Sequence, residues 1–482
     1  MMNPAPGTAP GTVPGPGTGP DPGAGSPPLA ATPRLAEGQP LRSLPRVAST
    51  SASAGVFEVA LTAAPFDVEL VSGVRTTFWA YNGAVPGPLL EATEGDRVRI
   101  TFTNQLAQES TIHWHGMPVP AAQDGNPMNP VAPGATRVYE FTLPDGCAAS
   151  YWYHPHPHRV THEQVFRGLA GAFIVKPRSE PLPGLVDTPL VISDLRLDAA
   201  GRIAPNTAMD FQFGREGDAL LVNGGRRPVL TAAPNASHRL RLFNATNARY
   251  LRLAFDNAPM TLIATDGGLL GAPVGGLAEL LLAPGERAEV VVAFAADTAL
   301  RALTYDRGPM MSGMTASASD TILTERVLGA PATPVGLPST LRPVAPLPAE
   351  TASKSFVLGP AMMMGGMAGM SMNAFTINGR SFDMSRIDAT ARAGAVELWE
   401  VANPTGMDHP FHVHGTQFQV VERLRGGTRT PAPYLAWKDT VNVSAGETVR
   451  FRVRQDSPGL RMYHCHILEH EDQGMMGVLE VI

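Results

Sequence analysis

The sequence predicts an all-β protein, because its composition and its alternation both favour strands over helices. Its 482 residues include 49 Gly and 46 Pro, with 44% hydrophobic and 17% charged residues. Such a composition is typical of short strands joined by tight turns. The segment VRITFTN, which ends at Asn104, alternates apolar and polar residues with the period of a half-buried strand. The chain is longer than a single hydrophobic core ordinarily organises, so we expect about three domains.

The N-terminal segment differs from the rest of the chain. Its first 33 residues contain a single charged residue, Asp21, and almost no bulky apolar side chains. Such a segment cannot bury enough surface to fold, so we predict a disordered Pro/Gly/Thr-rich tail over residues 1–54. An export signal has a charged region followed by an apolar stretch, and we see no such pattern in this segment.

Charge and cysteine content exclude several classes of function. The net charge is −6, and Lys and Arg are scattered rather than clustered, so we expect no nucleic-acid partner. No apolar run approaches the ~20 residues that span a bilayer, so we expect no membrane span. Two cysteines could form at most one disulfide, which would consume Cys465 of an HCH motif. We interpret Cys147 as a small buried hydrophobic residue.

A loose pattern recurs three times along the chain. Each copy begins with an Asn-Gly turn, at Asn82, Asn223 and Asn378. About 20 residues later an alternating strand ends in Asn, at Asn104, Asn244 and Asn403. A repeat of this length built from strands indicates three similar β-sandwiches rather than a solenoid. We place them at 55–177, 178–335 and 336–482, with soft boundaries in Pro-rich segments.

Histidines are concentrated at matching places in the first and third copies. Ten of the 13 fall in or just after four motifs: HWHG at 113–116, YHPH at 153–156, HPFHVHG at 409–415 and YHCH at 463–466. The middle copy has RYLRL at 249–253 and no histidine at either place, so we interpret it as a spacer and wall. This clustering at equivalent positions of two repeats predicts a metal centre.

Strand geometry divides these residues into two sites. Side chains at i and i+2 of a strand share a face, so each HxH motif directs two imidazoles the same way. Eight imidazoles converging between two domains are too many for one metal and suit a cluster of copper ions. Cys465 lies on the opposite face, where His409, His470 and Met475 complete the ligand set of a blue-copper centre. Zinc is the competing metal, but no structural zinc pattern fits.

From about residue 55 to its end, the chain resembles the three-domain multicopper oxidases, close to the bacterial laccases and cuprous oxidases. The motifs HWHG, HPH, HPFHVHG and HCHILEHEDQGMM together carry this resemblance. It implies three consecutive cupredoxin-like Greek-key sandwiches, with four copper ions as cofactors and dioxygen as electron acceptor. The first and third domains would each supply half of a trinuclear copper site.

The resemblance also implies which residues hold each copper. The type 1 copper would be held by His409, Cys465, His470 and Met475, and the type 2 copper by His113 and His412. The type 3 pair would be held by His115, His154 and His466 on one ion and by His156, His414 and His464 on the other. No ligand position is missing or substituted in this chain.

Two acidic residues match family positions that deliver protons to the oxygen site. They are Asp124, in AAQDGNP, and Glu471, in LEHEDQG. The alternative for Asp124 is a turn-forming residue before Gly, and for Glu471 a solvated loop carboxylate. The remaining histidines, His158, His162 and His238, match no ligand position, and we interpret them as structural or surface residues.

The electron donor is less well defined by the sequence. Two Met-rich segments, 308–314 and 361–372, lie outside the repeated strands, and thioethers are soft ligands that select Cu(I). We predict a substrate-copper role for Met407 by its family position and for the methionines of the second segment: Met362, Met363, Met364, Met367 and Met370. Flexible filler is the alternative for such segments. At Thr405 the sequence departs from the cuprous oxidases, which have an acidic ligand there.

Three hypotheses follow for function. The first is an oxidase of phenols, aromatic amines and Cu(I). The second is a copper-sequestering or delivery protein with incidental turnover, and the third is a scaffold of the same fold without activity, which the complete ligand set disfavours. A copper nitrite reductase would not need eight converging histidines. We expect a monomer in the periplasm or outside the cell, on the basis of copper handling and family habit.

Overall fold

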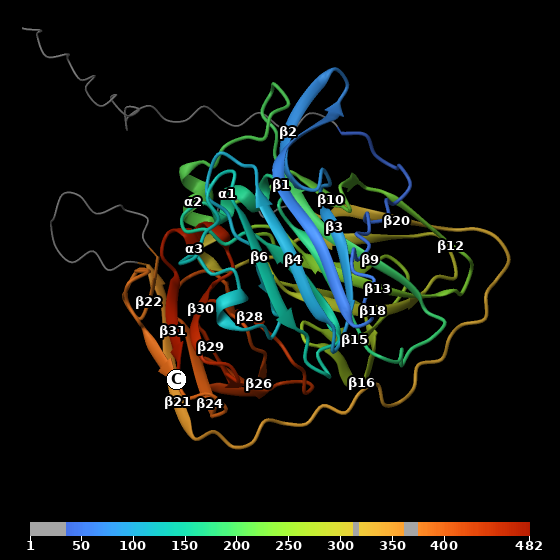
Figure 1. The fold of residues 1–482 in the computed structure, drawn as a ribbon. Coiled ribbons are helices and arrows are strands. Elements are labelled where there is room, and N and C mark those ends of the chain that lie inside the picture. The colour runs from blue at the N-terminus through green and yellow to red at the C-terminus, as the bar shows by residue number, and fades with distance from the viewer. Residues whose placement is uncertain (1–34, 312–317, 361–374) are drawn as a thin grey trace, which may run out of the picture.

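The computed structural model describes residues 35–311, 318–360 and 375–482, and within them the chain forms six β-sheets arranged as three sandwiches. Figure 1 shows the first and second domains packed side by side, with the third against both. Only short helices occur in the described part, and none is long and apolar enough to cross a membrane. The all-β prediction is confirmed.

The first domain consists of two four-stranded sheets. One contains β1 (Val56–Val71), β2 (Val74–Tyr81), β4 (Arg97–Asn104) and β6 (Thr136–Thr142). The other contains β3 (Gly87–Thr93), β5 (His113–His115), β7 (Ala149–His154) and β8 (Gly171–Lys176). A short 3-10 helix, η1 (Ala121–Gln123), follows β5, and helix α1 (Thr161–Phe166) lies between β7 and β8.

The second domain packs a seven-stranded sheet on a five-stranded one. The larger sheet contains β9 (Val186–Leu195), β10 (Ala219–Val222), β11 (Gly225–Arg226), β13 (Ser237–Asn244), β15 (Met260–Thr265), β16 (Gly268–Leu277) and β18 (Arg287–Ala293). The smaller contains β12 (Val229–Ala232), β14 (Leu251–Phe255), β17 (Leu280–Leu282), β19 (Thr298–Leu303) and β20 (Asp320–Val327). Helix α2 (Ala208–Phe213) follows β9, and η2 (Pro309–Met311) follows β19.

The third domain has sheets of six and five strands. The first contains β21 (Ala352–Pro360), β22 (Phe375–Ile377), β24 (Val396–Asn403), β26 (Phe418–Arg425), β27 (Thr428–Pro431) and β29 (Glu447–Arg454). The second contains β23 (Ala389–Ala391), β25 (His409–Val413), β28 (Thr440–Val443), β30 (Gly459–Cys465) and β31 (Met476–Val481). Helix α3 (Leu468–Asp472) connects β30 to β31.

The three sequence repeats adopt the same local structure. In each Asn-Gly turn both residues have positive φ, as at Asn82 (51°) and Gly83 (68°), which a type I′ turn requires. The asparagine that ends the long strand also has one role in all copies. Asn104, Asn244 and Asn403 each donate from the side-chain amide to one backbone carbonyl of the following loop and to one carbonyl of a segment further along the chain. The repeated asparagines therefore fix turns and loops rather than bind ligands.

Strand burial departs from simple alternation in the middle domain. Strands β4 and β24 largely alternate buried and partly buried positions as predicted, whereas every residue of β13 is buried. The polar face of β13 packs against the first domain, where Arg241 donates to Ser150 of β7 at 3.0 Å and to Glu289 at 2.8 Å. Alternation by itself cannot reveal a polar face that a neighbouring domain covers.

Residues 35–54 correct the predicted extent of the tail. They run as an extended segment over the first two domains, with bridges from Glu37 to Arg226 and from Arg46 to Leu89. Leu35 and Leu44 are buried in the contacts between these domains. Leu41 and Val47 are partly buried against the same two domains, and together these side chains supply the apolar contacts that hold the segment. Residues 1–34 lie outside the described part of the chain.

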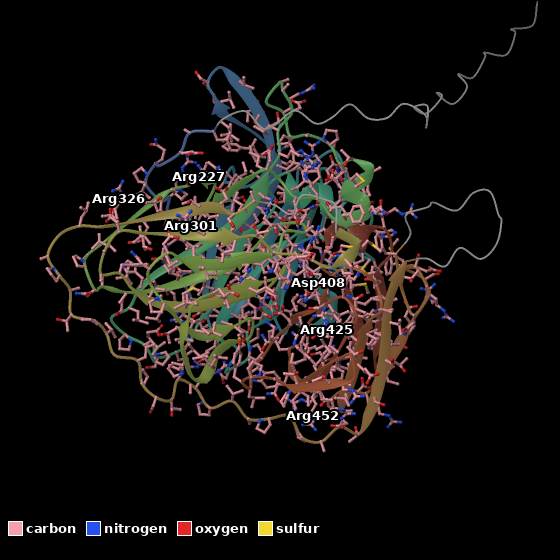
Figure 2. All side chains as sticks on the ribbon, turned by 180° about the vertical axis from the view of Figure 1, so that it is seen from behind. Arg227, Arg301, Arg326, Asp408, Arg425 and Arg452 are labelled. Carbon is pink, nitrogen blue, oxygen red and sulfur yellow. The ribbon has the colours of Figure 1, made fainter. Side chains whose placement is uncertain are left out.

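Several arginines at the surface of the second and third domains are paired with carboxylates. Figure 2 labels Arg227, Arg301 and Arg326 on the second domain and Arg452 on the third. Their partners are Asp320, Asp256, Asp297 and Glu350, respectively.

Candidate metal centre

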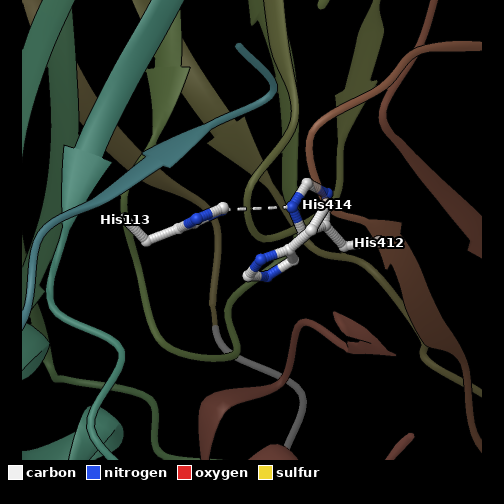
Figure 3. A group of neighbouring side chains, drawn as sticks. All are labelled: His113, His412 and His414. Atoms are coloured by element: carbon white, nitrogen blue, oxygen red, sulfur yellow. Dashed lines mark hydrogen bonds between the residues drawn. The ribbon is translucent and has the colours of Figure 1, made fainter. Parts of the chain in front are cut away.

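The four histidine motifs meet between the first and third domains. Strands β5 and β7 are paired so that His113 lies opposite His154, and β25 and β30 are paired so that His412 lies opposite His464. Figure 3 shows His113 of the first domain facing His412 and His414 of the third. The HxH spacing therefore does what strand geometry predicts, and it directs eight imidazoles into one enclosed space.

The ring nitrogens approach one another closely across the domain boundary. The Nε2 atoms of His113 and His412 lie 3.4 Å apart, and those of His156 and His464 lie 3.2 Å apart. His414 Nε2 is 3.0 Å from His464 Nε2. All eight histidines are fully buried. Imidazoles that crowd nitrogen to nitrogen in a dry interior have the arrangement of metal ligands.

Sets of three side chains have ligand atoms within 4.8 Å of one another and could each hold an ion. Four such sets occur among the histidines of this space and their neighbours: His113, His412 and His414; His113, His115 and His154; His156, His414 and His464; His115, His412 and Asp439. The third set coincides with the residues predicted for one type 3 ion. His466 lies beside the first-domain ligands, its ring centroid 4.9 Å from that of His115.

Backbone carbonyls set the orientation of four of these eight rings. The Nδ1 atoms of His113, His412 and His464 lie 2.9–3.0 Å from the carbonyl oxygens of Asp124, Asp439 and Cys465, respectively. A carbonyl can only accept, so Nδ1 carries the proton and the Nε2 lone pair points into the shared space. This second contact is what fixes tautomer and direction in metal-binding histidines. His115 is reversed, with Nδ1 inward, 3.4 Å from His154 Nε2.

Electrostatics also suit a metal. Burial lowers the pKa of His115, His154, His412, His414 and His466 well below the usual value, and that of His156 to about 3. These rings are therefore neutral, the form in which imidazole binds a cation. Both ring nitrogens of His466 are buried without a hydrogen-bond partner in the part of the chain that the structure describes. Such orphaned atoms are costly, and a coordinated ion would satisfy them.

Cys465 faces away from this space into a second group. Its Sγ lies 3.5 Å from His409 Nδ1 and 4.0 Å from His470 Nδ1, and those two nitrogens are 3.4 Å apart. Met475 is buried next to it, its carbonyl accepting from the Cys465 amide at 3.0 Å. Burial raises the pKa of the Cys465 thiol above its usual value. A bound cation would reverse that shift and stabilise the thiolate.

The outer nitrogens of this second group are occupied by protein groups. His409 Nε2 lies 3.0 Å from the Thr405 hydroxyl, and His470 Nε2 lies 3.2 Å from the Gln212 carbonyl at the end of α2. The half-buried ring of Phe375 stacks on His470 with centroids 3.9 Å apart. The second and third domains therefore both close over these histidines.

Both predicted proton-carrying residues lie against the histidines. Asp124 is fully buried, with Oδ1 3.2 Å from His113 Nδ1 and Oδ2 3.1 Å from His414 Nδ1. Glu471 is buried in α3, with Oε2 3.1 Å from His464 Nδ1 and Oε1 3.5 Å from His156 Nε2. Glu471 is therefore not the solvated loop carboxylate considered as the alternative. Burial would raise its pKa, but the neighbouring His156 and His464 outweigh this and lower it.

Asp439 and Arg287 are part of the site and were missed in the sequence. Asp439 Oδ1 lies 3.0 Å from His115 Nε2, while the Arg287 guanidinium donates to both Asp439 oxygens at 2.6–2.7 Å. Arg287 belongs to β18 of the middle domain and is fully buried. The interpretation of this domain as spacer and wall is thus incomplete. The only available signal was KDT at 438–440 within a strand pattern, which is weak.

The other residues singled out in the sequence differ in burial, and some lie outside the described part of the chain. His162 and His238 are buried and His158 is half-buried. Met407 is buried in the core of the third domain. Cys147 is a buried free cysteine of the first-domain core, as predicted, and burial raises its pKa to about 12. The loop methionines, Met362, Met363, Met364, Met367 and Met370, lie outside the described residues.

Comparisons with known proteins agree with this geometry. Three family models described as multicopper oxidase match residues 63–180, 192–314 and 360–482. The chain is 35% identical over 410 residues to multicopper oxidase mco of Staphylococcus haemolyticus, an alignment that covers 83% of each chain. The protein belongs to the multicopper oxidase family.

Solved structures and a second group of relatives add to this. A multicopper oxidase from Campylobacter jejuni, described as a metallo-oxidase, superposes with a TM-score of 0.88 at 40% identity, covering 94% of this chain and 98% of that one. The McoA multicopper oxidase of Aquifex aeolicus gives 0.81 at 31% identity, covering 92% and 100%. The chain is also 33% identical over 429 residues to cell division protein FtsP of Escherichia coli, covering 85% and 86%.

Proposed function

We propose that this protein oxidises one-electron donors at a type 1 copper and reduces dioxygen to water at three further coppers. One observation carries the proposal: two buried donor sets, one containing the thiolate and one made of eight histidines, share strand β30. Cys465 belongs to the first set and His464, its neighbour in the chain, to the second. A binding protein would have no need for two differently composed metal groups joined in this way.

In this proposal the type 1 copper is held by His409, Cys465, His470 and Met475. The type 2 copper is held by His113 and His412, and the type 3 pair by two sets of three: His115, His154 and His466; His156, His414 and His464. The converging Nε2 atoms, the neutral rings and the orphaned nitrogens of His466 support this assignment. Four coppers supply four one-electron stores, the number that reduction of dioxygen to two waters requires.

Electrons would pass from the donor side to the oxygen side through the backbone at Cys465. The peptide bond between His464 and Cys465 is the shortest covalent connection between the two groups. The hydrogen bond from His464 Nδ1 to the Cys465 carbonyl, 3.0 Å long, adds a second contact along the same route. The pairing of β25 with β30 holds both histidine groups in register.

Asp124 and Glu471 would hold and release the protons that oxygen reduction consumes. Each carboxylate contacts one histidine of the first domain and one of the third, so each lies at the edge of the enclosed space where the two domains meet. Their burial keeps bulk water away, so protons reach the site by way of defined groups. Asp439, held by Arg287, orients His115 and shields the charge of the type 2 side.

The donors would be phenols, aromatic amines and Cu(I). The Campylobacter jejuni protein described as a metallo-oxidase and the Met-rich segment 361–372 favour the metal ion. So does the closure of the type 1 side, where Gln212 and Thr405 already occupy the outer nitrogens of His470 and His409. A small cation needs less open surface than an aromatic ring.

The test compares kcat/KM for Cu(I) and for a phenolic donor, measured by oxygen uptake, in the copper-loaded full chain and in a deletion of 361–372. We expect the deletion to lower kcat/KM for Cu(I) by about tenfold or more and to leave or raise that for the phenol. Unchanged Cu(I) oxidation would remove the recruiting role from this segment. Absence of oxygen uptake with either donor, in protein that binds four coppers, would favour sequestration or delivery instead.

A second candidate function is a non-enzymatic role in cell division, which the similarity to FtsP of Escherichia coli favours. Under that hypothesis the fold would act as a binding scaffold and its histidines would be dispensable. The complete and converging donor set of this chain argues for the oxidase. Copper quantitation separates the two, because a scaffold has no reason to retain four ions per chain.

A further inference from the structure

Helix α3 carries His470 and Glu471, and the first domain holds it through a buried pair. The His162 side chain, on α1, donates from Nδ1 to Asp472 Oδ2 at 2.6 Å, and the His162 backbone amide donates to the same oxygen at 2.8 Å. His162 and Asp472 are both buried. Two donors from one residue converging on one carboxylate oxygen fix both the distance and the direction between α1 and α3.

The second domain holds the other side of the same helix. The amides of Asn206 and Asn247 donate to Glu469 Oε1 at 3.1 and 2.9 Å. Asn247 also donates to the His162 carbonyl at 3.0 Å, so its amide joins all three domains. The Gln473 amide donates to the Phe211 carbonyl at 2.6 Å. Figure 1 shows α1, α2 and α3 grouped at this junction.

Helix α3 cannot fix its own orientation. It is five residues long, and a helix of little more than one turn is unstable without tertiary contacts. The residues that hold it, Glu469 and Asp472, flank the two residues that face the metal groups, His470 and Glu471. A rotation of this single turn would therefore move the His470 ring relative to Cys465 and the Glu471 carboxylate relative to His464.

We infer that His162 is a positioning residue which acts through Asp472 to fix α3, and thereby sets the geometry of the type 1 ligand His470 and of Glu471. The inference rests on the proposed function, because it takes His470 to be a copper ligand. It assigns the first domain a role at the donor side, to which that domain contributes no ligand. It also replaces the interpretation of His162 as a merely structural residue.

The test uses the copper-loaded full chain and two substitutions of different kinds. His162→Leu removes the side-chain donor, whereas His162→Asn keeps an amide donor where Nδ1 stands. The control is His238→Leu, at another buried histidine, which lies in the second domain and whose ring nitrogens have no hydrogen-bond partner among the described residues. The measurements are the blue absorption, the EPR hyperfine splitting, the type 1 reduction potential and kcat.

We expect His162→Leu to shift the blue band and the hyperfine splitting and to lower kcat about tenfold at unchanged copper content. In His162→Asn the blue band and the hyperfine splitting stay at their wild-type values and kcat lies within about twofold of the wild type. His238→Leu matches the wild type in all of these measurements. A folded His162→Leu variant with the wild-type spectrum and potential overturns the inference. So does a His162→Asn variant as altered as His162→Leu, because the donated hydrogen bond is then not what positions the helix.

If His162→Leu does not fold, Asp472→Leu decides from the other side of the pair, because it keeps the approximate size of the side chain and removes the oxygen that accepts from His162. A shifted blue band in that variant supports the inference, and a wild-type band overturns it. Failure of the proposed function is recognised separately. A wild-type chain that binds copper without blue absorption refutes the type 1 assignment itself, whereas a blue wild type with an unaffected His162→Leu refutes only the positioning role.

Discussion

The second and third domains share one local design and differ in what they contribute to the centre. Both contain an Asn-Gly turn of positive φ, and both end a long strand with an asparagine that holds the next loop. The third domain then presents His409, His412 and His414, where the second presents the buried Leu251 and Leu253. The fold thus tolerates either a core or a ligand set at the same place.

The second domain nevertheless supports the centre from outside the ligand set. Arg287 holds Asp439 against His115, the Gln212 carbonyl contacts His470, and Asn247 joins α3 to the first domain. A domain without ligands therefore positions the ligands of its neighbours. The comparison separates two contributions, chemistry from the third domain and positioning from the second, and four substitutions test that separation.

The largest effect is expected for Cys465→Ser in the third domain. A hydroxyl does not replace a soft thiolate, so the blue absorption disappears and donor oxidation falls by at least about 100-fold. The His464 and His466 rings are unaffected, so three coppers stay bound. Copper quantitation with EPR checks this. Loss of all four coppers would show that the two groups do not assemble independently.

The second largest effect on activity is expected for Glu471→Gln. The amide keeps the shape of the side chain next to His464 but cannot take up and release a proton, so oxygen reduction slows by roughly 100-fold. The blue band should persist, because the Glu471 carboxylate faces His156 and His464 of the other group. Stopped-flow reoxidation by dioxygen measures the effect. Unchanged turnover at saturating reductant would remove Glu471 from proton delivery.

Arg287→Met tests the positioning role of the second domain. It leaves the Asp439 carboxylate buried without its cation, so the free energy of unfolding should fall by about 3–5 kcal/mol. The matched control is Arg301→Met, which breaks an exposed pair with Asp256 in the same domain and should cost less than about 1 kcal/mol. Denaturant unfolding compares them. Equal losses would mean that Arg287 is an ordinary ion-pair residue.

Glu325→Gln probes a buried carboxylate of the second domain whose two oxygens have no hydrogen-bond partner among the described residues. Burial, followed by the charge of Asp297, raises the pKa of Glu325 to about 8. The folded state thus keeps a proton that the unfolded chain loses near pH 4.5, so stability falls as the pH rises between these values.

From pH 6 to pH 7 this carboxylate should cost the wild type about 1.4 kcal/mol of unfolding free energy, a loss that the variant lacks. Denaturant unfolding at the two pH values gives the difference directly. A variant with the same pH slope as the wild type would show that Glu325 acquires a counter-charge or water when it ionises.

Much of the centre follows from local sequence. Each HxH motif needs only strand parity to direct two imidazoles together, and HCH needs only the same parity to separate Cys465 from His464 and His466. The Asn-Gly turns are equally local, because the conformation they require is favoured by the two residues themselves. These features could be predicted because residues within two positions of each other determine them.

Other features depend on contacts between distant segments. Residues 35–54 were predicted to be disordered, yet Leu35 and Leu44 are buried once two domains offer a surface. The polar face of β13 looks solvent-exposed in sequence, but Arg241 is covered by Ser150 of the first domain. Nothing near Arg287 indicates that it meets Asp439, 152 residues away along the chain.

Strand period, turn chemistry and ligand spacing are short-range properties, so the order of residues is enough to predict the all-β class, the threefold repeat and the residue types of both donor groups. Three outcomes emerge only from the folded chain: which carboxylates contact which histidines, how the ligand-free second domain closes over His470, and that α3 is held by all three domains. Those outcomes depend on how whole sandwiches pack, and burial converts ordinary Asp, Arg and His residues into positioning groups only after that packing.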